Sequence, residues 1–299
     1  MSSPPRPPLQ AAFESSGATV SPGVAAAGGP LVLALSIHAD DCSVAIGSAR
    51  GAVAEFWSRQ PERQQPGARR PGEAQGPLAS RDALVLLDRL MLRTAIPLER
   101  VECLAFAQGP GAFTSLRVAA GLVQGLGLGL ALPVAGIGSF EAMAAHASGW
   151  HEPQAEWLQL GAIDARMGEC YYAVHRCRAG SYPEALAGPL VGSAAQAIAV
   201  FERMLGAGHA VVAAGNAFVA LPVLREWAVA AGLDPDAAAG HAPTADAVLA
   251  LATSSGAPPG GPAEAALPVY VRDKVALDVD EQRLRALARA AGAAEAAQG

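Results

Sequence analysis

The stretch that decides the fold reads VECLAFAQGPGAFTSLRVAAGLVQGLGLGLALPVAGIGSF, from Val101 to Phe140. Its first apolar run ends at Ala107, before the sequence QGPG, and apolar residues return at wider spacing from Phe113. This pattern predicts a buried strand, a tight turn and a helix. A further short strand is predicted at 133–137.

The turn in this stretch carries Gly109 and Gly111. Glycine permits positive φ and a close backbone approach, and the N-terminus of the helix that follows offers free N–H groups to an anion. Thr114 or Ser115 is in position to cap that helix. Three interpretations are open: a connecting turn, a docking surface or a phosphate site. It is not a Walker loop, because no Lys and Ser/Thr pair follows the second glycine.

Four segments resemble one known family. The turn and helix match the family's GPGSFTGLR pattern at Gly109, Pro110, Gly111, Phe113, Thr114, Leu116 and Arg117, and depart from it at Ala112 and Ser115. The other three are LALSIHADDCSVAI at 33–46, GAIDARMGECYYAV at 161–174 and PVYVRDKVA near the C-terminus. Together they resemble the TsaB (YeaZ) family, the dimerisation subunit of the bacterial system that makes threonylcarbamoyladenosine beside the tRNA anticodon.

Strands that alternate with helices in both halves of the chain suggest an α/β protein with mixed sheets. The resemblance sharpens this to the actin-like ATPase (ASKHA) architecture, with two related lobes of which the second is reduced. We expect a disordered extension at 1–30, a first lobe at 31–150, a second lobe at 151–276 and a C-terminal tail at 277–299.

The remaining elements follow from apolar period and capping residues. Strands are predicted at 31–37, 42–47, 51–58, 158–163, 170–175, 210–214 and 269–272. Helices are predicted at 80–93, 139–147, 194–205, 217–230 and 244–253, and a loop at 59–76.

The resemblance implies a non-catalytic partner subunit that supports a TsaD-like enzyme in transferring threonylcarbamoyl to tRNA adenosine. It also implies a TsaE-like ATPase as a further partner, contact with tRNA only through the complex, and a homodimer when the chain is alone. No cofactor is expected in the isolated chain, and ATP at the partner complex is left open. The alternatives are a stand-alone kinase or ATPase of the actin-like superfamily and a homodimeric scaffold.

Actin-like ATPases usually place an acidic residue at the end of the first strand, where this chain has Ser36. Serine does not supply the charge that holds magnesium. Asp164, at the matching strand end of the second lobe, is the best lone candidate for a phosphate or metal contact, and is equally placed to receive Arg166 or to cap its own hairpin. In TsaD, an H-x-x-x-H metal pair lies on the helix that follows the strand corresponding to 133–137 of this chain. The matching residues here are Ser139 and Met143, so we predict no metal site.

Two helices are candidates for a partner interface. In the helix at 80–93, Ala83, Leu84, Leu87, Leu90 and Met91 are predicted to face the sheet. Val85 and Leu92 form a second narrow strip, which either meets a partner or is covered by another part of the chain. On the helix from Thr114, we expect Arg117, Gly121 and Gln124 opposite the bulky face, where another helix can come close.

The composition limits the class of protein. With 52% hydrophobic residues, 299 residues can bury a substantial core, and a net charge of −6 argues against a lone nucleic-acid binder. The four cysteines form no C-x-x-C pair, so we predict buried reduced thiols and a cytoplasmic protein. No signal-peptide pattern is found at the N-terminus. The uncharged stretch 118–140 contains glycines and Pro133, so we predict a buried helix, turn and strand and not a membrane span.

Overall fold

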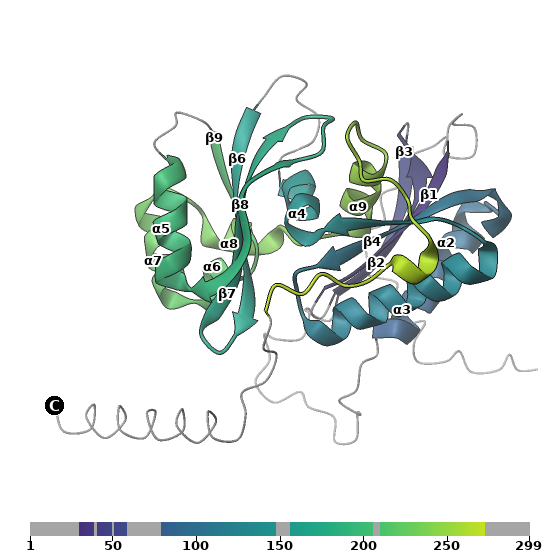
Figure 1. Ribbon diagram of the computed structural model, residues 1–299, viewed down its shortest axis with the longest axis horizontal. Coiled ribbons are helices and arrows are strands. Elements are labelled where there is room, and N and C mark those ends of the chain that lie inside the picture. Colours follow the sequence, from purple (N-terminus) through teal and green to yellow (C-terminus); the bar gives the residue numbers. More distant parts are fainter. Residues whose placement is uncertain are drawn as a thin grey trace, which may run out of the picture. The chain divides into compact units, whose positions relative to one another are not determined.

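The computed structural model describes residues 30–38, 41–49, 51–58, 79–147, 156–205 and 210–272 (Figure 1). Four predicted features lie outside these residues: the extension apart from Pro30, the loop at 59–76, the boundary between the two lobes at 150 and the tail from 277. Contacts divide the chain into one compact unit that ends at Val269 and another that begins at Tyr270.

The first sheet has five strands in the order β3-β2-β1-β4-β5. They are β1 (Leu31–His38), β2 (Asp41–Ser48), β3 (Gly51–Ser58), β4 (Val101–Gly109) and β5 (Val134–Gly138). The first three form an antiparallel meander, whereas β1, β4 and β5 run parallel, so the sheet is mixed. The predicted strands of this half are confirmed.

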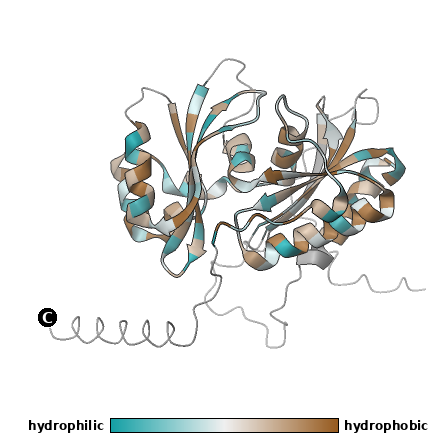
Figure 2. Ribbon diagram, viewed as in Figure 1, coloured by the Kyte–Doolittle hydropathy of each residue, from teal (hydrophilic) through white to brown (hydrophobic). Residues whose placement is uncertain are grey.

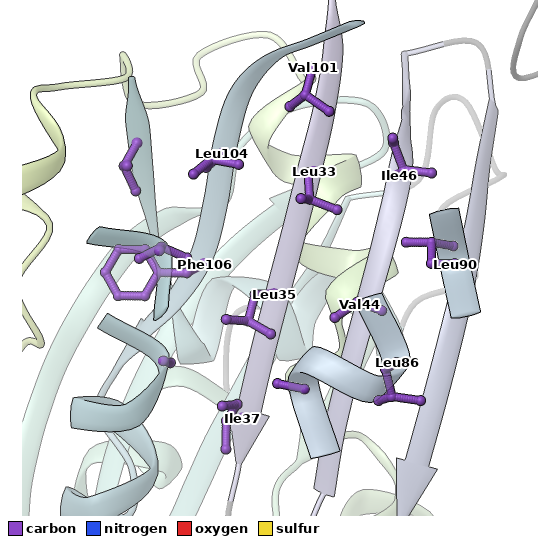
Figure 3. Packing of buried hydrophobic residues seen from close by; sticks show 14 of the residues in the cluster. Leu33, Leu35, Ile37, Val44, Ile46, Leu86, Leu90, Val101, Leu104 and Phe106 are labelled. Atoms are coloured by element: carbon purple, nitrogen blue, oxygen red, sulfur yellow. The ribbon is translucent and has the colours of Figure 1, made fainter. Parts of the chain in front are cut away.

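The first sheet is buried on both faces, which explains the continuous apolar run of β1. On one face lie α2 (Ala79–Thr94) and α3 (Phe113–Leu130), and on the other lies α9 (Ala245–Ala252). The cluster under α2 and α3 includes Leu33, Leu35, Ile37, Val44, Ile46, Leu86, Leu90, Leu104 and Phe106 (Figure 3). On the opposite face, Ala34 packs in a cluster with Val248 of α9.

The second sheet has four strands in the order β8-β7-β6-β9. They are β6 (Glu156–Arg166), β7 (Glu169–Arg178), β8 (Glu184–Ser193) and β9 (Ala210–Ala214), and only the β6 and β9 pair is parallel. The helices of this half are α5 (Ala194–Leu205), α6 (Ala217–Ala220), α7 (Pro222–Ala230) and α8 (Pro235–Gly240). In Figure 2, α5 has hydrophobic and hydrophilic sides, as expected of a helix packed on a sheet.

Helix α4 (Ser139–Ala147) contacts both sheets. Its residues Ala142 and Ala145 belong to the cluster that includes α9, whereas Phe140 and Met143 pack with Ile163 of β6. The helix is therefore apolar on two sides and joins the two halves of the core.

After α8 the chain returns to the first sheet. Helix α9 packs on β1, β2 and β4, and the short 3-10 helix η4 (Ala263–Ala265) packs on α3. Beyond η4, the Val269 N–H donates to the Gln108 carbonyl of β4. The lobe boundaries at 150 and 276 stay a prediction. The contacts of α9 show that a helix from late in the chain covers the first sheet.

Some elements differ from expectation. Strand β8 and helix α8 were not predicted. The predicted strand at 269–272 is not formed, although the Val269 N–H donates to the Gln108 carbonyl of β4. β8 lies at a sheet edge, is largely exposed and contains Pro189, so it lacks the apolar alternation of a half-buried strand. The helix predicted at 217–230 is two helices, because Pro222 begins α7.

Helix α3 is long and apolar enough to cross a membrane by length and composition. In this fold it lies on the first sheet, with Leu116, Ala119 and Val123 buried, and β5 follows it. The predicted helix, turn and strand at 118–140 are confirmed. The cytoplasmic location stays a prediction.

Candidate functional site

The turn after β4 is closely covered. Gly109 has φ +117°, and a Cβ atom there would lie 2.8 Å from the Val269 carbonyl oxygen and 2.9 Å from the side chain of Leu116. A Cβ on Gly111 would lie 3.5 Å from His38 Nδ1. Gly109 thus permits close packing of its own chain, which favours the connecting interpretation, whereas a Cβ on Gly111 would make only an ordinary van der Waals contact. The phosphate interpretation stays a prediction.

No side chain caps the start of α3, and the nearby His38 adds no positive charge to this turn. Ala112 occupies the N-cap position and makes no side-chain cap hydrogen bond, while Thr114 is exposed and Ser115 buried within the first turn. The predicted cap by Thr114 or Ser115 is therefore wrong. Burial lowers the pKa of His38 to about 4, so its imidazole is neutral at physiological pH.

Ser36 is used to fasten another part of the chain. Its buried hydroxyl donates to the Pro243 carbonyl, and Ser43, opposite Ser36 in the ladder, accepts a hydrogen bond from Ala245 N at 2.9 Å. Two serines on β1 and β2 thus hold the start of α9. At the place where an ATPase has its acidic residue, this chain has an internal hydrogen bond.

Asp164 is engaged within its own hairpin. Its Oδ1 accepts from Arg166 N at 2.8 Å, its Oδ2 lies 3.5 Å from an Arg166 guanidinium nitrogen, and its N–H donates to Asn216 Oδ1. Arg166 and Met167 have φ of 65° and 58°, an unfavourable conformation for residues with a side chain. The carboxylate supports this tight turn and also meets the Arg166 side chain, as predicted for its role in the hairpin. The predicted phosphate or metal contact stays a prediction.

A buried acid and base pair lies between α4 and the second sheet. Glu141 Oε1 is 3.5 Å from Nε2 of His175, whose side chain is 1% exposed. Burial by itself would raise the pKa of Glu141, but its pairing with His175 outweighs burial and lowers that pKa. Gln159, opposite His175 in the ladder, donates to the Phe140 carbonyl. The sequence holds no motif that could have revealed this pair.

The cysteines are not poised for chemistry. None of the four forms a disulfide. Cys42, Cys170 and Cys177 are buried, as predicted, whereas Cys103 is only half-buried. Burial raises the pKa of Cys170 to about 11 and that of Cys177 to about 12, so both thiols stay protonated. Within the described ranges, no group of three or more His, Cys, Asp or Glu residues is placed to hold a metal ion.

The exposed surface of α2 differs from the predicted strip. Leu92 is 77% exposed, but Val85 is only partly exposed and packs against the core of the first sheet. Val85 and Leu92 thus do not form one free strip. The buried stripe of α2 runs through Ala83, Leu86 and Leu90, and Leu84, predicted to face the sheet, is 50% exposed.

The outer face of α3 is open. A Cβ on Gly121, Gly125 or Gly129 would meet no atom within 4 Å. Arg117 is exposed, and its guanidinium carbon lies 3.9 Å from the centre of the Phe113 ring. Gln124 Nε2 donates to the Ala266 carbonyl at 3.1 Å, so this side chain holds the C-terminal segment. Between α2 and α3, Leu84, Leu87, Leu122 and Leu126 line an apolar crevice.

Comparison with known sequences points to one biosynthetic system. The model of the family described as "TsaD: tRNA N6-adenosine threonylcarbamoyltransferase" matches residues 71–223, about half of the chain. The chain is 44% identical over 90 residues to the tRNA threonylcarbamoyladenosine biosynthesis protein TsaB of Haemophilus influenzae, and 38% identical over 93 residues to that of Escherichia coli. These matches cover 30% and 31% of this chain but only 37% and 39% of the two relatives. The chain thus spans less than half the length of the curated relatives that it matches.

Two solved structures match most of the described fold. One is YeaZ from Pseudomonas aeruginosa, with a TM-score of 0.58 and 26% identity, covering 81% of this chain and 100% of the other. The second is described as an uncharacterized protein with similarity to peptidase YeaZ from Pseudomonas aeruginosa, with a TM-score of 0.61, 26% identity and coverages of 82% and 100%. This likeness confirms the predicted α/β, actin-like ATPase architecture.

Proposed function

The chain belongs to the TsaB (YeaZ) family and matches the TsaD family model, and on this premise we propose that it is the non-catalytic partner of a TsaD-like enzyme. In this role it supports transfer of threonylcarbamoyl to the tRNA adenosine next to the anticodon. The names of the curated relatives, which are biosynthesis proteins for threonylcarbamoyladenosine, support the choice of pathway.

The contacts of two residues support a non-catalytic role. The Ser36 hydroxyl is bonded to the Pro243 carbonyl, and both carboxylate oxygens of Asp164 face Arg166. An actin-like ATPase needs acidic groups at these strand ends to position metal-bound phosphate. Here the first position is uncharged and the second serves its own hairpin.

The observation that carries the proposal is the open face of α3. Glycine costs about 1 kcal/mol relative to alanine inside a helix, yet Gly121, Gly125 and Gly129 recur on a side that no neighbouring atom crowds. A glycine face lets a second helix come close. We place the partner interface on this face and on the exposed Leu92 of α2, with Arg117 at its edge.

Val85 and Gln124 are left out of this interface, because Val85 packs on the core and Gln124 is bonded to Ala266. A TsaE-like ATPase joins the pair in our proposal, and tRNA is reached through the complex, since a net charge of −6 does not favour direct binding to nucleic acid. In the absence of the enzyme, the same face of α3 is free to pair with a second copy.

Binding to the purified TsaD-like partner, measured by titration calorimetry, tests the proposal. Gly121→Leu places a side chain in the path of an approaching helix, and Leu92→Asp puts a charge into an apolar contact. We expect each to weaken association by about tenfold or more, the size of a change at an interface centre. Val223→Asp is the matched control, because Val223 is an exposed residue on α7 of the second half.

Unchanged affinity in both variants would move the interface away from these helices. The enzyme alternative has its own test, a titration with nucleotide and magnesium followed by a turnover assay. Turnover of ATP by the purified chain that is abolished by Asp164→Ala would overturn the non-catalytic role.

A further inference from the structure

The connection between α8 and α9, residues His241–Thr244, is fastened to three elements. The Pro243 carbonyl accepts a hydrogen bond from Ser36 of β1, and directly after the connection Ala245 N donates to Ser43 of β2. From α4, His146 Nδ1 lies 2.9 Å from the Ala242 carbonyl oxygen. Pro243 and Thr244 are buried.

Two histidines meet at this connection. The rings of His146 and His241 lie edge to face, with centroids 5.8 Å apart and planes at 87°. A carbonyl oxygen only accepts hydrogen bonds, so His146 Nδ1 must carry a proton, and Nε2 is the atom that gains one in acid. His241 is half-buried, and burial, followed by the nearby His146, lowers its pKa from the usual 6.5. His241 therefore favours its neutral form.

We propose that His146 and His241 form an acid-sensitive latch on the connection between α8 and α9. When both rings are protonated, like charges face each other at close range and one of them is partly desolvated. The connection then separates from α4, and the first turn of α9 loosens with it. Among the described residues, the polar groups at the connection include the uncharged hydroxyls of Ser36, Ser43 and Thr244, and the exposed carboxylate of Asp246 lies in the first turn of α9.

The direction of the pH effect follows from the lowered pKa of His241. The folded protein binds a proton at His241 less readily than the unfolded chain does. The stability that neutral His241 contributes is therefore fully present above about pH 6.5. It is lost as the pH falls from there towards the lower pKa of the folded state. The latch therefore releases as the pH falls below about 6.5.

Hydrogen exchange of the full chain tests the latch, with rates corrected for the intrinsic effect of pH. Between about pH 7.5 and about pH 5.5, we expect on the order of tenfold more opening at residues 241–249 in the wild type. His146→Gln and His241→Gln should keep the protection seen at neutral pH, because the glutamine amide cannot titrate. His209→Gln is the control variant and should open in acid as the wild type does.

A second measurement stays informative if His241→Gln does not fold. His146 is exposed, so His146→Gln removes little buried packing. NMR titration of the His241 ring in this variant should show its pKa raised towards the usual value. An unchanged His241 pKa, or an equal acid opening at 241–249 with and without His146, would overturn the proposal.

Discussion

The glycines of α3 differ in their surroundings. Gly121 points to open space, whereas a Cβ on Gly127 would lie 2.7 Å from the Cβ of Ala263 and 3.0 Å from the side chain of Val134. Gly127 is thus required by packing inside the chain. Gly121 has no such internal reason, which is why we assign it to a partner.

The first prediction compares these two glycines. Gly121→Ala should stabilise the fold by about 1 kcal/mol through helix propensity, which raises Tm by about 2–4 °C for a chain of this size. Gly127→Ala should destabilise it by about 1–3 kcal/mol, because η4 or β5 must shift. Thermal unfolding of both variants measures the difference. A loss of stability in Gly121→Ala would mean that its outer face is covered within the chain.

The second prediction concerns Glu141. Because His175 lowers its pKa, the carboxylate contributes stability that is fully present above the ordinary value of 4.5 and is lost as the pH falls through the folded pKa. The urea midpoint of the wild type should therefore fall more steeply in this acid range than that of Glu141→Gln. Glu99→Gln, at an exposed glutamate, should keep the wild-type slope. Equal slopes in all three proteins would contradict the role of the pair.

Some of these residue roles were visible in the sequence and others were not. Ser36 could be singled out because the family resemblance fixes the type of residue expected there. Its partner Pro243 is 207 positions away, and no local pattern connects the two. The same holds for His175 and Glu141, since a buried polar pair is defined by the packing of α4 on β7.

The elements were predictable where a strong apolar period exists. Helix α5 and strand β9 occupy the expected ranges, because their apolar residues face one core. Helix α8 was missed because its six residues, PDAAAG, are too short to show a period. Its start was still encoded, since Asp234 accepts hydrogen bonds from Asp236 N and Ala237 N, which is an ordinary N-cap.

The third prediction belongs to α2, whose buried face is rotated from the expected one. Val85→Asp should destabilise the fold by about 2 kcal/mol or more, because it places a carboxylate beside the core of the first sheet. Leu92→Asp should change the unfolding free energy by less than about 0.5 kcal/mol, as is usual for an exposed site. Urea unfolding of the two variants decides between them. Similar stability of both would restore the single partner-facing strip.

At the scale of the whole molecule, the order of elements in sequence is not their order in space. Helix α9 follows every strand of the second sheet but covers the first. Sequence alone suggested two successive lobes, because apolar period shows that a helix packs on something and does not show on what. The fold class was predictable because both halves repeat the alternation of strands and helices.

The fourth prediction tests this return of the chain. Leu249→Ala should cost about 2–5 kcal/mol, since Leu249 is buried in the cluster between α9 and the first sheet. Hydrogen exchange should speed up most in β1, β2 and β4, which α9 contacts. Leu224→Ala on α7, buried in the core cluster of the second half, is the matched variant and should act most on α5 and α6, which α7 contacts. Loss of protection in the second sheet alone, in the Leu249 variant, would contradict the assignment.

The late position of α9 also has a consequence for synthesis on the ribosome. The five strands of the first sheet are complete once Gly138 has emerged, but the helix that covers one of its faces is made more than a hundred residues later. At about 5–20 residues per second, that face waits for several seconds or longer with Val32 and Ala34 not yet covered by α9. The nascent chain thus presents an apolar sheet surface for chaperones during this interval, until a late helix covers the sheet that was made first.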